Sequence, residues 1–167
     1  MYTRLIILML VCNLLYAQQP KEPKAETRFY LKSLTGEKVD KLYYSAGDTG
    51  HEKLLFDPGT WHTADEKEFI IKNFSPNNNE SLVCISVGTE LSEKYTLLIV
   101  DVATGKILED IIFNCSNFNI SWLPDNQSFS YCRSDMGVNK AGEMLGAVYF
   151  HKVGTSAAED ASISLRD

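Results

Sequence analysis

The sequence predicts an all-β protein: a partial β-propeller of about three four-stranded antiparallel blades, preceded by a signal peptide. From Phe29 onward, short apolar or aromatic runs alternate with turn residues at intervals of about 8–12 residues, which is typical of β-sandwiches, barrels and propellers. A segment made of an aromatic residue, a Pro–Asx turn and a new apolar strand occurs twice, 48 residues apart. A period of about 40–50 residues that holds four short strands is typical of a propeller blade.

Residues 1–17 predict a cleaved export signal. Arg4 is the only charged residue before Lys21, and the apolar run Leu5–Val11 follows it. A basic start, an apolar run of about 7–15 residues and a small residue before a polar segment form the pattern of a secretory signal. We expect cleavage after Ala17, and therefore a secreted or periplasmic protein.

Two other roles of this segment are less consistent with its residues. Asn13 and Gln18 interrupt the apolar run before the roughly 20 residues that a membrane-spanning helix needs, so no membrane partner is expected beyond the signal itself. Lipid modification of Cys12 is the other alternative, and Val11 is bulkier than the residue that usually precedes such a cysteine.

The segment 18–28 is rich in Pro and Lys, lacks an apolar period and predicts a flexible leader before a single unit over 29–167. Without residues 1–17 the chain carries 15 basic and 22 acidic residues, a net charge of −7. Nucleic acid is not an expected partner, because phosphate contacts need clustered Lys and Arg. Cys84, Cys115 and Cys132 remain, which permits at most one internal disulfide, so stability has to come from a core.

Ten strands are expected from the apolar runs and the turns between them, while segments 63–68 and 157–161 are weakly helical and too short to be stable alone. The expected strands are Phe29–Leu34, Lys41–Ser45, Lys53–Phe56, Phe69–Phe74, Leu82–Val87, Tyr95–Val102, Ile107–Phe113, Asn119–Trp122, Phe129–Arg133 and Ala147–Val153.

The repeat consists of Phe74–Asn79 before the strand at Leu82 and Trp122–Gln127 before the strand at Phe129. Leu54–Pro58 is a partial third copy, which matches the strand and the turn. A four-stranded blade cannot bury both of its faces alone, so blades have to stack. An irregular β-sandwich with two similar hairpins is the alternative interpretation.

About 150 residues correspond to three blades, whereas propellers close with about 4–8. We therefore expect either a longer protein, or assembly with further copies of the chain through open blade edges, or the sandwich.

Four segments resemble the start of the propeller domain of the prolyl oligopeptidase family of serine peptidases. They are Lys53–Pro58, Phe69–Asn79, Tyr95–Leu108 and, as the most specific part, Ile120–Tyr131 together with the Tyr-Phe-His-Lys-Val-Gly-Thr run at Tyr149–Thr155. The resemblance covers about two-thirds of the chain. It departs from the family in three ways: no helical segment precedes the propeller, Asn78 replaces the usual Gly of the turn, and the sequence holds few blades.

The resemblance implies that the intact family cleaves short peptides after proline, that the propeller gates access to the catalytic cavity, and that no cofactor takes part. Peptide substrate, the missing hydrolase domain and the remaining blades are the implied partners. In the family the nucleophile, base and acid all lie in that hydrolase domain. We therefore assign no catalytic, cofactor-binding or metal residue in this chain. A non-catalytic periplasmic propeller-like module that binds peptides or proteins is the alternative function.

The candidate nucleophiles and acids of the sequence do not form a recognisable site. The Gly-x-Ser-x-Gly turn of a serine hydrolase is missing, and Gly154-Thr155-Ser156-Ala157-Ala158 ends in Ala. The histidines are far apart and the cysteines lack ligand spacing, so His151 is expected to be a strand residue that pairs across the blade, and Cys84 and Cys132 to pack in strands. The residues concerned are His51, His62, His151, Cys84, Cys115 and Cys132.

Two further sets of residues are considered as candidate site residues, and solvent exposure or packing explains most of them. The carboxylates Glu90, Glu93, Asp101, Glu109 and Asp110 are expected at solvated strand and loop positions. The aromatic residues Tyr43, Tyr44, Trp61, Trp122 and Tyr131 could line a peptide groove, but packing between blades explains most of them equally well.

Overall fold

The computed structural model of the chain describes residues 27–47, 50–61, 68–116, 120–133, 137–138, 144–145 and 147–164. Outside these ranges lie the expected signal peptide 1–17, most of the leader, His62 and the weakly helical segment up to residue 67. In the described part of the chain, no helix is long and apolar enough to cross a membrane.

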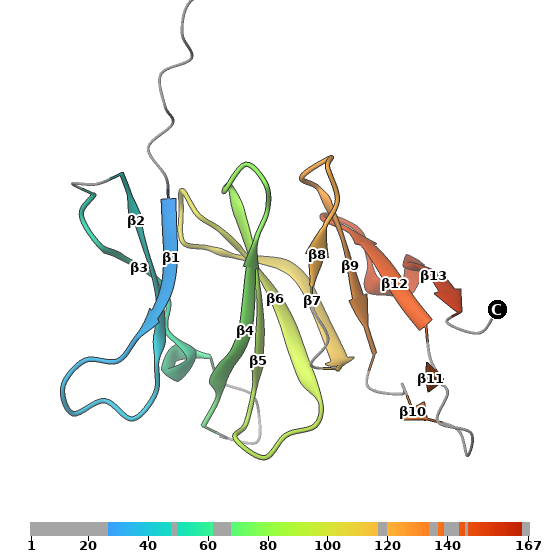
Figure 1. Ribbon diagram of the computed structural model, residues 1–167, viewed down its shortest axis with the longest axis horizontal. Coiled ribbons are helices and arrows are strands. Elements are labelled where there is room, and N and C mark those ends of the chain that lie inside the picture. Colours follow the sequence, from blue (N-terminus) through green and yellow to red (C-terminus); the bar gives the residue numbers. More distant parts are fainter. Residues whose placement is uncertain are drawn as a thin grey trace, which may run out of the picture.

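Three antiparallel sheets stand side by side along the molecule, and we call them blades 1, 2 and 3 (Figure 1). Blade 1 has the order β1-β2-β3, blade 2 the order β4-β5-β6-β7, and blade 3 the order β8-β9-β12-β13. The bounds of their strands are β1 Thr27–Lys32, β2 Lys41–Ala46, β3 Lys53–Phe56, β4 Ile70–Pro76, β5 Leu82–Gly88, β6 Tyr95–Asp101, β7 Ile107–Cys115, β8 Ser121–Trp122, β9 Ser128–Cys132, β12 Ala147–Lys152 and β13 Ala161–Ser164.

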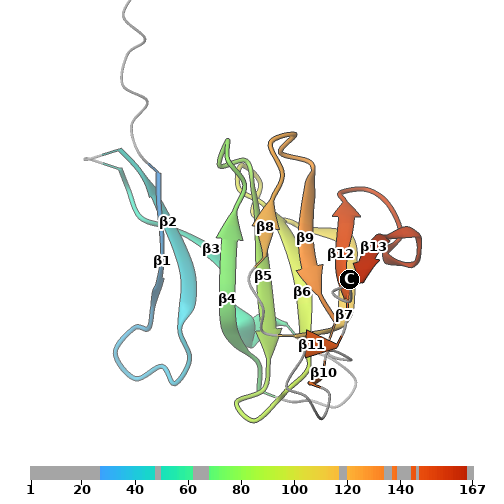
Figure 2. The ribbon, with the colours of Figure 1, turned by 45° about the vertical axis from the view of Figure 1, so that its right-hand side comes forward.

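Three smaller elements complete the fold. A two-stranded hairpin of β10 (Gly137–Val138) and β11 (Met144–Leu145) is inserted between β9 and β12. The 3-10 helix η1 (Pro58–Thr60) follows β3, and a second one, η2 (Ala157–Glu159), precedes β13. Turned by 45°, the ribbon shows the strands of blades 2 and 3 running beside one another (Figure 2).

Blade 2 is buried on both faces, because alternate residues of its strands point to opposite sides of the sheet. On β5, Val83 and Ile85 belong to the core cluster shared with blade 1, whereas Cys84 belongs to the cluster shared with blade 3. On β6, Leu98 faces blade 1 and Ile99 faces blade 3 in the same way. All five of these aliphatic and thiol positions on the central strands lack solvent exposure, which explains why these strands are near-continuous apolar runs.

The two copies of the repeat occupy equivalent places, as predicted. Pro76 ends β4 and Asn77 begins the turn to β5, while the turn Pro124-Asp125 connects β8 to β9. In the first turn Asn77 Oδ1 accepts hydrogen bonds from the backbone N–H groups of Ser81 and Leu82. In the second, Asp125 Oδ1 accepts them from the backbone N–H groups of Gln127 and Ser128. The Pro–Asx pair therefore makes the turn after the first strand of each blade.

The third, partial copy is not equivalent to the other two. It ends β3, the last strand of blade 1, and Asp57 caps η1 by accepting a hydrogen bond from the N–H of Gly59 at 2.9 Å. The chain here leaves one blade for the next, whereas the other two copies turn within a blade. The strand and the turn of the partial copy are therefore confirmed, but they lie at the end of a blade and not after its first strand.

The remaining differences concern the edges of blades. Blade 1 has three described strands and not four, and β1 begins two residues earlier than predicted, at Thr27. The segment 157–161, which was predicted to be weakly helical, is one 3-10 turn followed by the start of β13. Strand β13 was missed because all four of its residues are exposed and Ile163 is its only large apolar side chain. The β10–β11 hairpin was also not predicted.

Candidate functional site

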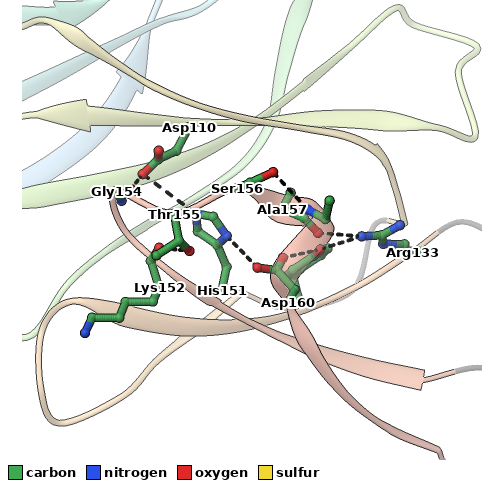
Figure 3. A network of polar contacts seen from close by, with 11 residues as sticks. Asp110, Arg133, His151, Lys152, Gly154, Thr155, Ser156, Ala157 and Asp160 are labelled. Atoms are coloured by element: carbon green, nitrogen blue, oxygen red, sulfur yellow. Dashed lines mark hydrogen bonds and ion pairs between the residues drawn. The ribbon is translucent and has the colours of Figure 1, made fainter.

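The most polar buried cluster of the described chain is centred on His151 of β12, at the contact between blades 2 and 3 (Figure 3). The His151 side chain is not exposed at all. Its Nδ1 lies 2.9 Å from Oδ1 of Asp160, and its Nε2 lies 3.7 Å from Oδ2 of Asp110. Asp160 precedes β13 of blade 3, whereas Asp110 comes from β7 of blade 2. A histidine therefore lies between two carboxylates that belong to different blades.

The second oxygen of Asp160 extends the cluster across blade 3. It accepts a hydrogen bond from the Tyr131 hydroxyl at 2.7 Å, and burial together with this bond raises the pKa of Tyr131. Arg133 donates from its Nη2 to the carbonyl of Ala157 at 3.0 Å, and its guanidinium lies 4.4 Å from the centre of the Tyr149 ring. Arg133 thus holds the 3-10 turn before Asp160 against the strand that carries Tyr131.

The expectation that the carboxylates occupy solvated positions was wrong for Asp110. Its side chain is only 10% exposed, and its Oδ2 also accepts a hydrogen bond from the backbone N–H of Gly154 at 2.5 Å. Glu90, Glu93 and Glu109 are exposed as expected. Asp101 closes the β6–β7 turn: hydrogen bonds from the side chain and backbone of Thr104 lower the pKa of Asp101.

The Asp160–His151 pair resembles two members of a serine-hydrolase triad, but no serine among the described residues takes the third place. In a triad, Nε2 of the histidine faces a serine hydroxyl; here it faces the carboxylate of Asp110 and has no hydrogen-bond partner in the described part of the chain. Ser156 caps η2 by accepting a hydrogen bond from Ala158 N, and the Thr155 hydroxyl donates to the carbonyl of Lys152. The polar contacts of the cluster connect blades 2 and 3.

In the part of the chain that the structure describes, neither His51 nor any group of possible metal ligands extends this site. His51 is exposed in the β2–β3 connection, and His151 pairs with Phe129 across blade 3, in the strand position expected for it. Across the ranges given above, no three His, Cys, Asp or Glu side chains are grouped as metal ligands.

The cysteines are buried free thiols within the described residues. Cys84 lies in β5 and Cys132 in β9, as expected. Burial raises the pKa of the Cys115 thiol to about 12 and raises the pKa values of Cys84 and Cys132 as well. Because the thiolate is the reactive form, these side chains are inert packing groups near neutral pH.

The aromatic residues that could line a peptide groove are mostly committed to the cores. Tyr44 and Trp61 pack against the cluster between blades 1 and 2, and Trp122 and Tyr131 belong to the cluster between blades 2 and 3. Tyr43 lies opposite Tyr30 on the β1–β2 pair, and the two rings stack at 6.3 Å.

A cavity of about 750 Å³ opens between blades 1 and 2, at the end of the sheets opposite the β4–β5 turn. The β1–β2 loop, the start of β4 and the β5–β6 loop form its walls, which combine charged and apolar groups. The lining residues are Lys38, Val39, Asp40, Glu68, Ile70, Ile71, Thr89, Glu90 and Leu91.

Comparison with known proteins identifies the family. The sequence model described as "Prolyl oligopeptidase, N-terminal beta-propeller domain" matches residues 20–166. A prolyl endopeptidase from Elizabethkingia miricola is 28% identical over 140 residues, which cover 80% of this chain. The corresponding enzyme from Elizabethkingia meningoseptica is 26% identical over 137 residues, or 78% of this chain. The chain spans about a fifth of the length of these relatives, 19% in both cases.

Solved structures show the same fold. A structure from a study of two prolyl endopeptidases superposes with a TM-score of 0.70 at 19% identity, over 87% of this chain and 22% of that one. Oligopeptidase B from Leishmania major superposes with a TM-score of 0.65 at 20% identity, over 84% of this chain and 19% of that one. With the three stacked sheets and the equivalent Pro–Asx turns, these matches support one conclusion: the chain belongs to the prolyl oligopeptidase family, as a part of its N-terminal β-propeller domain.

Proposed function

We propose that the chain is the part of a secreted prolyl oligopeptidase-like serine endopeptidase that restricts which substrates reach the catalytic cavity, and that it does not hydrolyse peptides by itself. The intact enzyme would cleave short peptides after proline. The observation that carries the proposal is the family membership of residues 20–166 in the propeller domain. The packing of blade 2 against both neighbours supports it.

The packing gives a physical reason for size selection. The residues of β5 are buried along its full length, so blades 1 to 3 meet through continuous apolar cores without a gap at the centre of blade 2. Interiors of this density do not open for a folded protein. A wall of this kind would admit a short flexible peptide around its ends or through an opening between blades and would exclude larger chains.

A chimera tests the gating. The segment of the Elizabethkingia miricola enzyme that matches this chain is replaced by residues 20–166, and cleavage of a short chromogenic proline peptide is compared with cleavage of an unfolded protein. We expect the chimera to cleave the peptide and to discriminate against the long chain as strongly as the parent enzyme does. Equal cleavage of both substrates by an intact, folded chimera would contradict gating by this segment.

The catalytic part of the proposal is tested on the chain alone. The sequence has no Gly-x-Ser-x-Gly, and Nε2 of His151 faces a carboxylate. The purified 167-residue chain is expected to leave the chromogenic proline peptide uncleaved, in the presence and absence of a serine-reactive fluorophosphonate. Turnover that the fluorophosphonate abolishes would refute the proposal that the chain does not hydrolyse peptides by itself. It would leave the proposed gating unaffected.

Export is a separate element of the proposal and rests on the pattern of residues 1–17. Expression of the full chain in a bacterial host, followed by fractionation and mass determination, is expected to give a periplasmic product that begins at Gln18. Replacement of Leu8 by Arg would interrupt the apolar run and is expected to leave the chain uncleaved in the cytoplasm. An intact N-terminus in the wild-type product would contradict the cleavage.

The cavity between blades 1 and 2 favours a second candidate function, peptide binding without chemistry. Its volume of about 750 Å³ lies in the range of small-molecule and short-peptide sites. Leu91 at its rim is 93% exposed. If the cavity binds, a proline-containing hexapeptide will shift the amide signals of Thr89 to Leu91, and Leu91→Ala will weaken binding, whereas Phe113→Ala on an exposed position of β7 will not. No shift at millimolar peptide would exclude this function.

Association of this chain with further copies of itself is a third element of the proposal. Ile163 on β13 is 60% exposed and pairs with Val148 of β12, on the face of blade 3 opposite the His151 cluster. A further blade or another copy of the chain could cover this face. Light scattering on the eluting chain tests the second case: a mass above that of one chain that falls with Ile163→Lys supports it, and a clean monomer excludes it.

A further inference from the structure

We propose that His151 is a pH-sensitive clasp between blades 2 and 3, in which the protonated imidazolium binds Asp110 of one blade and Asp160 of the other. This inference does not depend on the gating proposed above. It concerns the stability of the contact between two blades and could operate in the chain alone or within a longer protein.

The hydrogen bond to Asp160 determines which ring nitrogen of His151 carries the proton of the neutral imidazole. The two oxygens of Asp160 face His151 Nδ1 at 2.9 Å and the Tyr131 hydroxyl at 2.7 Å. An ionised carboxylate can only accept hydrogen bonds, so Nδ1 of His151 carries the proton in the neutral ring. Nε2 is then the bare acceptor of the neutral imidazole.

That bare acceptor points at another acceptor. Nε2 is buried, has no hydrogen-bond partner in the described residues and lies 3.7 Å from Asp110 Oδ2. In the neutral state two lone pairs therefore face each other across the blade contact. Protonation places an N–H between them and converts the repulsion into a charge-assisted hydrogen bond, which is among the stronger polar contacts in proteins.

The charges around the ring also favour protonation of His151. Asp110 approaches from β7, Asp160 from the segment before β13, and Arg133 directly follows β9, beyond Tyr131. With a neutral ring the two carboxylates exceed the one guanidinium by one negative charge; with a protonated ring the cluster is neutral. The remaining face of His151 is covered by the Phe129 ring at 5.3 Å, while Tyr149 faces Tyr131, and Lys152 next in the chain is exposed.

The direction of the pH effect follows. The clasp is closed where the imidazole is protonated and released where it is neutral. The contact between blades 2 and 3 should therefore tighten as the pH falls and the ring gains its second proton, and loosen as the pH rises and the ring loses it. The amide of Gly154 reports on it directly, because it donates to the same oxygen of Asp110.

The first test is a titration of the full wild-type chain by NMR from about pH 5 to pH 8, the range in which histidine side chains ordinarily change their charge. We expect Nε2 of His151 to gain a proton while Nδ1 keeps one, and the Gly154 amide signal to move with the same midpoint. Hydrogen exchange of the Gly154 amide, corrected for its intrinsic pH dependence, is expected to be several-fold slower at the acidic end. A His151 ring that keeps one protonation state, or a Gly154 amide that does not respond, overturns the proposal.

The second test changes the partner of Nε2. The amide group of Asp110→Asn can donate to the neutral ring and still accept from Gly154, so this variant should lose or reverse the pH dependence of the urea midpoint between pH 5 and 8. Glu109→Gln removes one exposed carboxylate from the same strand and should keep the wild-type dependence. An Asp110→Asn variant with the wild-type dependence refutes the clasp. If the variant does not fold, the titration of the wild-type ring decides.

Discussion

Trp122 donates its indole N–H to the backbone carbonyl of Ser75 at 2.8 Å and so joins the first strand of blade 3 to the first strand of blade 2. The bond connects the two copies of the repeat, since Ser75 precedes the Pro–Asx turn of the first copy and Trp122 precedes that of the second. The turns themselves are also in contact, because the side chain of Asn77 donates to the carbonyl of Asn126 at 3.1 Å. One repeat unit therefore recognises the next through the residues that define the repeat.

Trp122→Phe should lower the free energy of unfolding, because it leaves the partly buried carbonyl of Ser75 without the indole donor and removes part of the core. An unsatisfied buried acceptor costs about 1–3 kcal/mol. Trp61→Phe is the matched control: the Trp61 indole nitrogen is buried without a hydrogen-bond partner in the described residues, so its removal should cost less. Urea unfolding of both variants checks this, and equal losses would show that ring volume and not the hydrogen bond dominates.

Asn77→Asp should destabilise the chain although Asp125 occupies the equivalent turn of blade 3. The Nδ2 group of Asn77 donates to Asn126 O and Ser81 Oγ, and a carboxylate cannot donate. Asn77 is 2% exposed, so the cost is expected to be about 1–3 kcal/mol. The same change at the exposed Asn78 should cost clearly less. Thermal unfolding at pH 7 compares the two, and an equal effect would contradict the inferred role of the amide.

The sequence predicts the central strands of this fold well because their signals are local. Strand β5 is a run of apolar residues between an Asn-rich turn and a glycine, and its predicted and observed first residues agree at Leu82. The Pro–Asx turns are equally local, since the side chain accepts from backbone groups within five residues. The strands at the edges are harder to predict: β13 buries none of its residues, so it lacks an apolar period.

The His151 cluster could not be predicted in the same way, because the stacking of two blades brings Asp110 and His151 together. A weaker signal was present. Asp110 lies between Leu108 and Ile112 on the face of β7 that packs toward blade 3, so a carboxylate occupies an inward position of an apolar strand. His151 lies in a similar position on β12, two residues after Tyr149. Strand periodicity marks both as buried polar residues but does not show that they meet.

The fold should lose stability in acid through its turn carboxylates. Hydrogen bonds from Ser128 and from the backbone N–H of Gln127 lower the pKa of Asp125, and hydrogen bonds from Thr104 lower that of Asp101. A carboxyl whose pKa is lowered by folding stabilises the native state above its unfolded value of roughly 3.9, and this contribution is lost as the pH falls through the folded value.

Asp125→Asn and Asp101→Asn should therefore each flatten the acid side of the stability curve below about pH 4. Glu93→Gln, an exposed carboxyl outside these turns, serves as the control. The urea midpoint between pH 2.5 and 5 measures the effect. An unchanged acid slope in both aspartate variants would show that these hydrogen bonds persist when the carboxyl is protonated.

The three buried thiols should be protected from modification until the blades separate. Cys84 has no exposed surface and Cys115 has 1%, and the pKa of Cys115 is raised to about 12, so neither access nor ionisation favours reaction at neutral pH. In native buffer Ellman's reagent is expected to label these cysteines slowly, and in urea all three rapidly. Cys132, at 8% exposure, should be the first of them to react.

The order of labelling also tests the packing between blades. Because Cys84 lies in the core between blades 2 and 3, Trp122→Phe should speed its labelling by weakening that contact, whereas the Trp61→Phe control acts on the opposite core and should leave it unchanged. Cys12→Ala in every sample removes the fourth thiol of the full chain from the count. Mass spectrometry of the labelled peptides gives the rate at each site. Rapid labelling of Cys84 in the unmodified fold would mean that blades 2 and 3 separate readily in solution, contrary to the continuous core described here.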